Sequence, residues 1–556
     1  MKKIIYTLIS FLVMTTYCSG NNVVISNISV LYTSSGAPQI QFDLSWENSW
    51  RVFSGPANYD AAWVFFKYKS NSTGLWTHVY MTGSDNVIPA GFDVYENSQI
   101  GLSTRAGAMI FRDVTNAGTG NVSITGIKLG VMTSLPYDID MKGFAIEMVY
   151  IPSAGNGVRL ISGDGNGVSE SQNAFHYVDN TATPVNSTQL MKADANAFDD
   201  THLTTDGIYV YPNDSIQTSN PIAPVDAFPT MKALWCMKYE LSQAGYVDFL
   251  NTLTQIQQAN RTTAPINSAI GTRVMPPTSN NFRNYIEIKS PAAGVATAVY
   301  GCDANSNNIF DEPNDGEWVS CNFLNWIDAA AYMDWSGLAP MSEVQYEHIC
   351  RGANTTGPLP AVYGEFAWGT NSVYGSPYVL SNAGAANEVI TNNTTGFGNA
   401  EWANTVPSVP ENGGLRNGIF ATPTSDRISS GATYYGVMDM TGGLSEYCIS
   451  MGTVAGRSTR LTPNGNGVIS ANGYALLTFT SPQSGWPGLD GNSSPTTPNA
   501  CTVTCEVYGN AGIMVRGGNW QTTPPASLSM ATRSSAQPVL FPRNEGYGCR
   551  GVLYIR

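Results

Sequence analysis

The chain has 556 residues, which is too long for one hydrophobic core and predicts two or three domains. Charged residues make up only 12%, about half the usual share, and the formal net charge is −14. Nucleic acid is excluded as an expected partner because phosphate binding needs clustered cations. The composition is typical of a loop-rich, β-rich extracellular protein.

The first 20 residues resemble a secretory signal peptide. Two lysines precede the apolar run from Ile4 to Met14, and small residues follow at Ser19-Gly20. That run is too short to cross a bilayer, and no later stretch reaches about 18 apolar residues. Lipid attachment to Cys18 is an alternative, although Tyr17 is a poor match to the small residue that lipoprotein processing needs. We therefore expect a secreted or cell-surface protein without a transmembrane span.

Residues 21–143 have the alternating pattern of β-strands. Ile40, Phe42, Leu44 and Trp46 alternate with polar residues, as a half-buried strand requires. Similar runs recur between clusters of glycine, asparagine and proline, with no long helical period among them. The pattern predicts an antiparallel β-sandwich domain.

From residue 144 to residue 556 the pattern changes to short helices between irregular segments. Apolar residues from Tyr246 to Leu253 follow a helical period, with Ser242 as N-cap. A second helix ends at Gly337, a suitable C-cap position. A third begins at Ser342, which forms a capping box with Gln345. Together with the sandwich, this predicts a loop-rich α+β protein.

Seven segments in this second region resemble, in order, the formylglycine-generating enzyme (sulfatase-modifying factor) family. They are Phe144–Pro152, Met237–Leu250, Asn325–Tyr332, Met341–Gly352, Gly436–Gly442 with Glu446, Arg516–Trp520 with Arg533, and Gly546–Gly551. The resemblance implies a loop-rich variant of the C-type lectin-like fold for residues 144–556. Residues 21–143 lie outside it.

The resemblance also implies a chemistry whose key residues are missing. The family's enzymes oxidise a cysteine of a sulfatase with two cysteines that hold copper(I), the soft thiolate pair that this ion prefers. Those cysteines lie between the arginine-glycine-glycine strand and the next arginine. Here that interval, Asn519 to Arg533, reads NWQTTPPASLSMATR and has Met530 as its only sulfur.

Two functions remain open. One is a non-catalytic surface protein that binds an extracellular glycan or protein, or assembles with its own copies. The alternative is a copper-dependent or otherwise altered oxidase of protein cysteine. The absent thiolates favour the first and predict that copper is not a cofactor.

An asparagine- and aspartate-rich segment predicts a calcium site. Side-chain oxygens stand at loop positions 1, 3, 5 and 9, with Asn308 at the turn and Asn314 in place of the usual glutamate. The expected ligands are Asp303, Asn305, Asn307, Ile309 through its carbonyl, Asp311, Glu312 and Asp315. A polar turn without an ion is the alternative, and the weaker Gly163–Gly167 cluster is interpreted as a turn.

The resemblance places a further set of residues around the family's cleft. They are Glu446, Tyr447, Asn519, Trp520 and Arg533. A tryptophan and an arginine with flanking amides suit contacts with a glycan or peptide. The alternative is structural, with a buried tryptophan and an arginine paired to Glu446.

Eight cysteines follow the signal segment, and an even number in an exported chain favours disulfides. Four scattered histidines and no CxxC pair make a zinc site improbable. Cys501 and Cys505 are expected to pair locally, and Cys302 with Cys321 across the calcium loop. The resemblance implies Cys350 with Cys549, which leaves Cys236 with Cys448.

Overall fold

The computed structural model describes thirteen continuous segments and four isolated strands. The segments are 16–18, 22–32, 38–98, 105–132, 135–153, 232–276, 282–352, 364–403, 412–459, 463–479, 485–494, 496–533 and 542–555. The strands are β10 (His176–Val178), β11 (Leu190–Ala193), β12 (Gly207–Val210) and β13 (Pro221–Pro224), which form one sheet. Residues 1–15 and the Gly163–Gly167 cluster lie outside the described residues, and so does the side chain of Cys18.

Two large sheets pack face to face at the N-terminal side. The outer sheet has the order β1 (Thr16–Cys18), β2 (Val23–Leu31), β3 (Gln39–Arg51), β8 (Gly118–Gly130). The central sheet has the order β24 (Val552–Tyr554), β14 (Leu234–Met237), β9 (Ile139–Ile151), β4 (Asp60–Ser70), β7 (Arg105–Arg112), β6 (Phe92–Ser98), and β5 (Trp76–Val79) pairs with β4. Every pairing within these two sheets is antiparallel.

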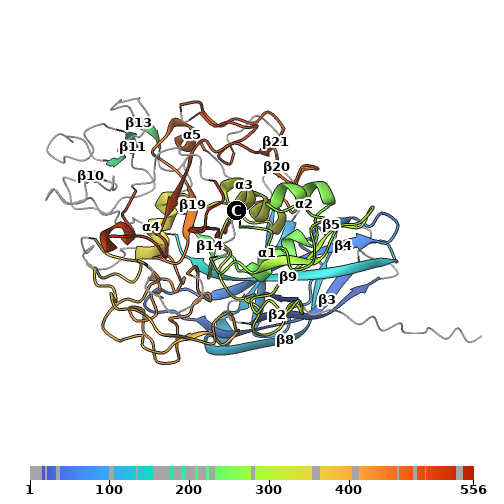
Figure 1. The fold of residues 1–556 in the computed structure, drawn as a ribbon, viewed down its shortest axis with the longest axis horizontal. Helices are drawn as coiled ribbons and strands as arrows, with labels where there is room; N and C mark the ends of the chain where they lie inside the picture. Colours follow the sequence, from blue (N-terminus) through green and yellow to red (C-terminus); the bar gives the residue numbers. More distant parts are fainter. Residues whose placement is uncertain are drawn as a thin grey trace, which may run out of the picture.

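The central sheet is buried on both faces, which explains why β4 is almost continuously apolar. Ala62, Val64 and Phe66 belong to the core between the two sheets, the sandwich core. Trp63 and Phe65 point the other way, into the main core shared with the helices. Figure 1 shows the resulting layers, with α1 and α2 on one side of β9 and β2, β3 and β8 on the other.

Five α-helices occur in the described part of the chain: α1 (Gln243–Leu250), α2 (Gln255–Arg261), α3 (Trp326–Ser336), α4 (Glu343–Arg351) and α5 (Val454–Arg457). Two 3₁₀ turns, Val114–Asn116 and Pro525–Leu528, add to them. The capping residues predicted from the sequence lie at the ends of the longer helices. The Ser242 side chain caps α1, Ser342 and Gln345 form the capping box of α4, and Gly337 ends α3 with a left-handed φ of 77°.

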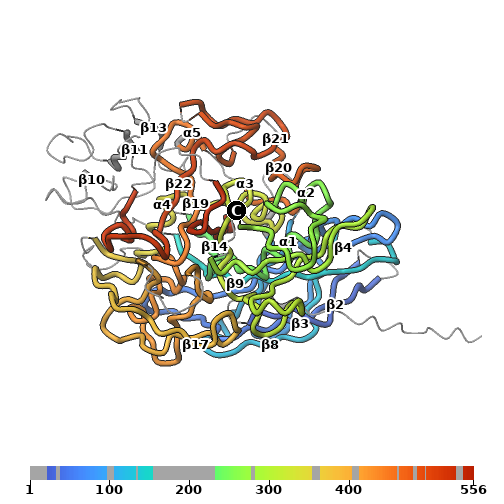
Figure 2. The backbone as a smooth tube through the Cα atoms, in the orientation of Figure 1, coloured from blue at the N-terminus to red at the C-terminus, as the bar shows by residue number. Residues whose placement is uncertain are grey.

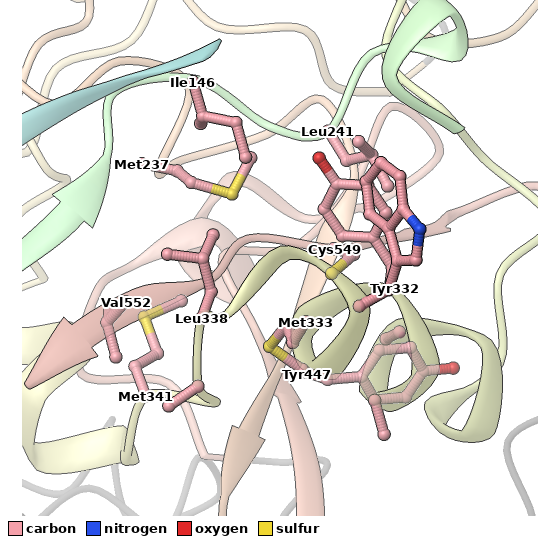
Figure 3. Packing of buried hydrophobic residues seen from close by; sticks show 14 of the residues in the cluster. Ile146, Met237, Leu241, Tyr332, Met333, Leu338, Met341, Tyr447, Cys549 and Val552 are labelled. Carbon is pink, nitrogen blue, oxygen red and sulfur yellow. The ribbon is translucent and has the colours of Figure 1, made fainter. Parts of the chain in front are cut away.

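Short strands complete the second region. They are β15 (Ile286–Ser290) with β16 (Val299–Cys302), β17 (Leu380–Ser381) with β18 (Val389–Ile390), β20 (Ala475–Thr478) with β21 (Thr504–Val507), and the three-stranded set β22 (Ile513–Arg516), β19 (Ser445–Ile449), β23 (Tyr547–Gly548). Segments distant in sequence meet here, since β20 lies beside α3 (Figure 2). Figure 3 shows how Met237, Tyr332, Met333 and Cys549 share the main core.

The expected α+β organisation with an N-terminal antiparallel region is confirmed, and the likeness to C-type lectins stays a prediction. Residue 143, the expected domain boundary, lies within β9. That strand pairs with β4 on one side and with β14 on the other, so both regions share the central sheet. Among the described residues, no helix is long and apolar enough to cross a membrane.

Candidate functional site

The segment predicted to bind calcium folds as a tight loop directly after β16. Asp303 is fully buried, and its two carboxylate oxygens accept hydrogen bonds from the backbone N–H groups of Asn307, at 3.1 Å, and Asn308, at 2.8 Å. Asn308 has a left-handed φ of 61°, as expected for the residue at the turn. The first carboxylate of the loop is therefore held in place by the loop's own backbone.

The other acidic groups of the loop are held by side-chain amides or by a lysine. The Asn305 side chain donates to Asp315 at 2.8 Å, and the Asn307 side chain donates to Glu312 at 2.7 Å. Asp311 forms an ion pair of 2.7 Å with Lys289, on the neighbouring strand. The side chain of Ile309 is 60% exposed, and its carbonyl is the group expected to bind.

Repulsion and burial raise the pKa values of carboxyl groups in and beside the loop. Burial, followed by the charge of Asp303, raises the pKa of Asp315 to about 6. Burial also raises the pKa of Glu287 to about 7 and that of Glu317 to about 8. A cation would relieve this repulsion, although no three His, Cys, Asp or Glu side chains of the described segments converge as metal ligands. Amide and backbone oxygens would have to complete the set.

Four of the five residues expected at the cleft are buried. Arg533 pairs with Glu343 through contacts of 2.5 and 2.9 Å, and Glu446 pairs with Arg550 at 2.7 Å. The Trp520 indole donates to the Glu545 carbonyl at 3.0 Å. The structural alternative predicted a buried arginine paired to Glu446, and the structure has one. That arginine is Arg550 instead of Arg533.

The remaining two residues have similar surroundings. The Tyr447 hydroxyl is buried and donates to the Leu324 carbonyl at 3.2 Å. Asn519 is half-buried, and its side-chain oxygen accepts from the backbone of Gln521 at 3.0 Å. Ligand contact by these five residues stays a prediction, and in this structure their side chains chiefly hold neighbouring segments together.

The interval where the family's cysteine pair would lie contains no thiol. Met530 is its only sulfur residue and is fully buried. The Arg516 guanidinium donates to the carbonyls of Met530, at 2.8 Å, and Thr532, at 2.7 Å, which fixes the end of the interval. A single buried thioether does not provide the two thiolates that copper(I) chemistry needs.

One of the four expected disulfides is formed, between Cys501 and Cys505. The other six cysteines are buried free thiols, which corrects the pairings Cys350–Cys549, Cys302–Cys321 and Cys236–Cys448. Helix α4 packs against β19, which brings the Cys350 thiol within electrostatic reach of Cys448. Burial raises the pKa of all six thiols, which keeps them protonated and unreactive.

Sequence reasoning missed a large cavity. Its volume is about 1020 Å³, and it lies where the hairpin of β4 and β5 meets α1 and the hairpin of β15 and β16. Trp76 and Asp248 line it. In the sequence Trp76 is only a strand residue and Asp248 only a polar position of a helix, so no local pattern brings the two together.

Comparison with known families gives one match. The model of the Sulfatase-modifying factor enzyme 1-like domain matches residues 187–552, which is more than half of the chain. Neither a curated protein nor a solved structure matches the chain.

Proposed function

The chain belongs to the Sulfatase-modifying factor enzyme 1-like family, and we propose that it is a non-catalytic, exported member that binds a ligand or builds an extracellular assembly. The observation that carries this proposal is the interval from Asn519 to Arg533. It has no cysteine, and its only sulfur, that of Met530, lies in the protein interior. Without two thiolates there is no place for copper(I) between these residues.

The buried cleft residues support the same proposal. Glu446 and Arg533 are both engaged in buried ion pairs, so neither is free to act as an acid, a base or an anion-binding group. The family's sequence pattern is retained over residues 187–552, while the groups that would touch a substrate are absent or held in ion pairs. The partners that we propose are an extracellular glycan or protein, or further copies of the chain.

A copper assay tests the absence of oxidase chemistry. Purified full-length protein is incubated with copper(I) and a cysteine-containing peptide, and bound copper and peptide thiol are measured before and after gel filtration. We expect no stoichiometric copper in the folded protein and no oxygen-dependent loss of peptide thiol. Stoichiometric copper with peptide oxidation would instead establish an altered oxidase. A sample unfolded in urea controls for copper taken up by the six buried thiols.

Calcium is the proposed cofactor, held by the loop from Asp303 to Asp315 with a structural role. The buried oxygens of Asp303 and the raised pKa of Asp315 support a cation at this place. Limited proteolysis with and without chelator is the test, with Asp303→Asn as the variant and the exposed Asp93→Asn as control. We expect chelation to speed cleavage near residues 303–315 in the parent and in Asp93→Asn, and Asp303→Asn to be cleaved fast under both conditions. Equal cleavage of the parent with and without chelator would exclude a bound ion.

A further inference from the structure

The cavity of about 1020 Å³ lies at the junction of the N-terminal strands and the family domain. The end of the central sheet forms one wall, through the β4–β5 hairpin and the start of β9. Helix α1 and the β15–β16 hairpin form the opposite wall. The volume is at the upper end of the range of about 300–1,000 Å³ that small-ligand sites occupy. Both regions of the chain are therefore needed to form it.

Trp76 provides an aromatic surface on the sheet wall. It is half-buried on β5, directly opposite Lys69 of β4. The ammonium groups of Lys69 and Lys142 stand 5.5 and 5.6 Å from the centre of its ring. Trp76 also lines the cavity, so part of its indole ring is open to an apolar ligand face beside the two cations.

Two opposite charges in the cavity make no ion pair and no hydrogen bond within the described residues. Lys69 forms an ion pair with Asp140 at 2.8 Å, but Lys142 makes neither an ion pair nor a hydrogen bond there. The Asp248 side chain, on α1, also has no such partner. Its pKa is raised to about 6, chiefly by burial, while the charge of Lys142 opposes the rise. A half-buried ammonium and a half-buried carboxylate thus remain available to a ligand.

The charges of the lining limit the class of ligand. Among the charged groups of the lining, Lys69 is paired with Asp140 and Lys289 with Asp311, and the pKa of Glu317, raised to about 8, keeps that carboxyl largely neutral. Lys142 and Asp248 remain, one positive and one negative group, so the charges balance. A strongly anionic or cationic ligand gains no net attraction from such a site. A purely apolar ligand would cover Lys142 and Asp248 without giving them hydrogen bonds, which is costly.

We infer that this cavity binds a neutral oligosaccharide, with one sugar ring packed on Trp76 and its hydroxyl groups bridging Lys142 and Asp248. Each sugar hydroxyl both donates and accepts, so it can accept from the ammonium and donate to the carboxylate. The apolar C–H face of the same ring suits the indole. This inference rests on the proposed role as a binder and names its site and ligand class.

A glycan array probed with the full-length protein, printed with neutral and acidic oligosaccharides and with apolar peptides, is the first experiment. Calorimetry with the strongest neutral hit then compares Trp76→Ala, Lys142→Met and Asp248→Asn with matched surface controls. The controls are Phe53→Ala, Lys232→Met and Asp93→Asn, all at exposed positions. We expect binding of neutral glycans, weakened about tenfold or more by each cavity variant and unchanged by each control. Trp76→Phe, which keeps an aromatic face, should retain most of the affinity.

The outcomes separate this inference from the proposed function. Glycan binding that all three cavity variants leave unchanged would overturn the cavity site, while the protein would remain a binder. Binding of apolar peptides alone, lost in Trp76→Ala, would overturn the sugar and keep the site. No binding to any probe, with single particles and no polymers in negative-stain images, would overturn both.

Discussion

The central sheet has a different kind of core on each face. Between the two sheets, the sandwich core consists of alternating apolar side chains such as Phe42, Val64 and Phe66. On the opposite face, apolar packing is combined with fully buried ion pairs. Four arginines, Arg283, Arg516, Arg533 and Arg550, are among the largest fully buried side chains of the protein.

These ion pairs connect segments that are far apart in the sequence. Arg533 and Glu343 are 190 residues apart, Arg516 and Glu347 are 169 apart, and Arg550 and Glu446 are 104 apart. Two of the pairs anchor α4 to C-terminal segments, one through Arg516 at the end of β22 and one through Arg533, which lies outside helices and strands. Where periodic hydrogen bonding is scarce, a charged pair of defined geometry fixes which segments meet. In the sandwich, register between long strands fulfils the same role.

The largest effect is expected from breaking one of these pairs. Arg533→Met leaves the Glu343 carboxylate buried without its partner, and removal of one member of a buried pair costs about 3–5 kcal/mol. Urea unfolding followed by tryptophan fluorescence measures the loss. We expect hydrogen exchange to rise first in α4 and around β19, since Glu343 also accepts from the Met451 backbone.

A double variant shows whether the cost arises from the unpaired charge. Arg533→Met combined with Glu343→Gln removes both charges, and it should recover part of the stability that Arg533→Met loses. If Glu343→Gln lowers the stability of the Arg533→Met variant as much as it lowers the stability of the parent, the two residues are not coupled. The contrast between the two cores would then have to be explained by apolar packing alone.

The sandwich core should respond to a change in volume instead. Phe66 is fully buried and packs edge-on against Phe42 at 5.2 Å between ring centroids. Phe66→Ala should cost about 3 kcal/mol or somewhat more. We expect faster hydrogen exchange in β2, β3 and β8 while α4 stays protected. Phe65, one residue earlier, faces the main core. Phe65→Ala should therefore speed hydrogen exchange in α4 while β2, β3 and β8 stay protected. The same exchange pattern for both variants would show that the two cores unfold as one.

The same contrast explains what the sequence could predict. Alternation in residues 40–46 identifies a strand without knowledge of its neighbours, and cap residues such as Ser342 identify a helix end from four residues. The partners of Arg533 and Glu446 could not be predicted, because any buried carboxylate of the chain could pair with Arg533 and any buried arginine with Glu446. Likewise, no local pattern indicates that β9 belongs to the same sheet as β4 and β14.

The candidate sites divide in the same way. The loop from Asp303 to Asp315 is a local motif, and its turn at Asn308 has the expected conformation. The cavity with Trp76 and Asp248 combines residues that are 172 apart in the sequence, counted as 248 − 76. It exists only because α1 lies over the end of the central sheet. Cysteine pairing is also a long-range property, and only the pair four residues apart was predictable.

Removal of the disulfide is expected to lower the stability by an intermediate amount and to act locally. It closes a loop of about five residues between Cys501 and Cys505, and the chain-entropy relation gives about 2 kcal/mol for that length. Cys501→Ala with Cys505→Ala should therefore lower stability by about 2 kcal/mol, with faster exchange confined to β20 and β21.

Peptide mapping without reduction should find this bridge and no other. The six remaining thiols should react with a thiol reagent only after unfolding, because all six are buried. A bridge between Cys350 and Cys549 in such a map would contradict the free thiols that the structure has at both positions.

The smallest effect is expected at a signal that could be predicted locally, the capping box of α4. The Ser342 side chain accepts from the Gln345 backbone at 3.2 Å, and the Gln345 side chain accepts from the Ser342 backbone at 2.8 Å. Ser342→Ala removes the first bond and should cost about 1 kcal/mol. Ser72→Ala, at an exposed position, serves as control, and urea unfolding measures both. Helix α4 is also anchored through Glu343 and Glu347. Loss of the Ser342 cap should therefore speed hydrogen exchange in the first turn of the helix and leave the ion pairs intact. A loss as large as that of Arg533→Met would mean that local capping, rather than the long-range pairs, determines where this helix lies.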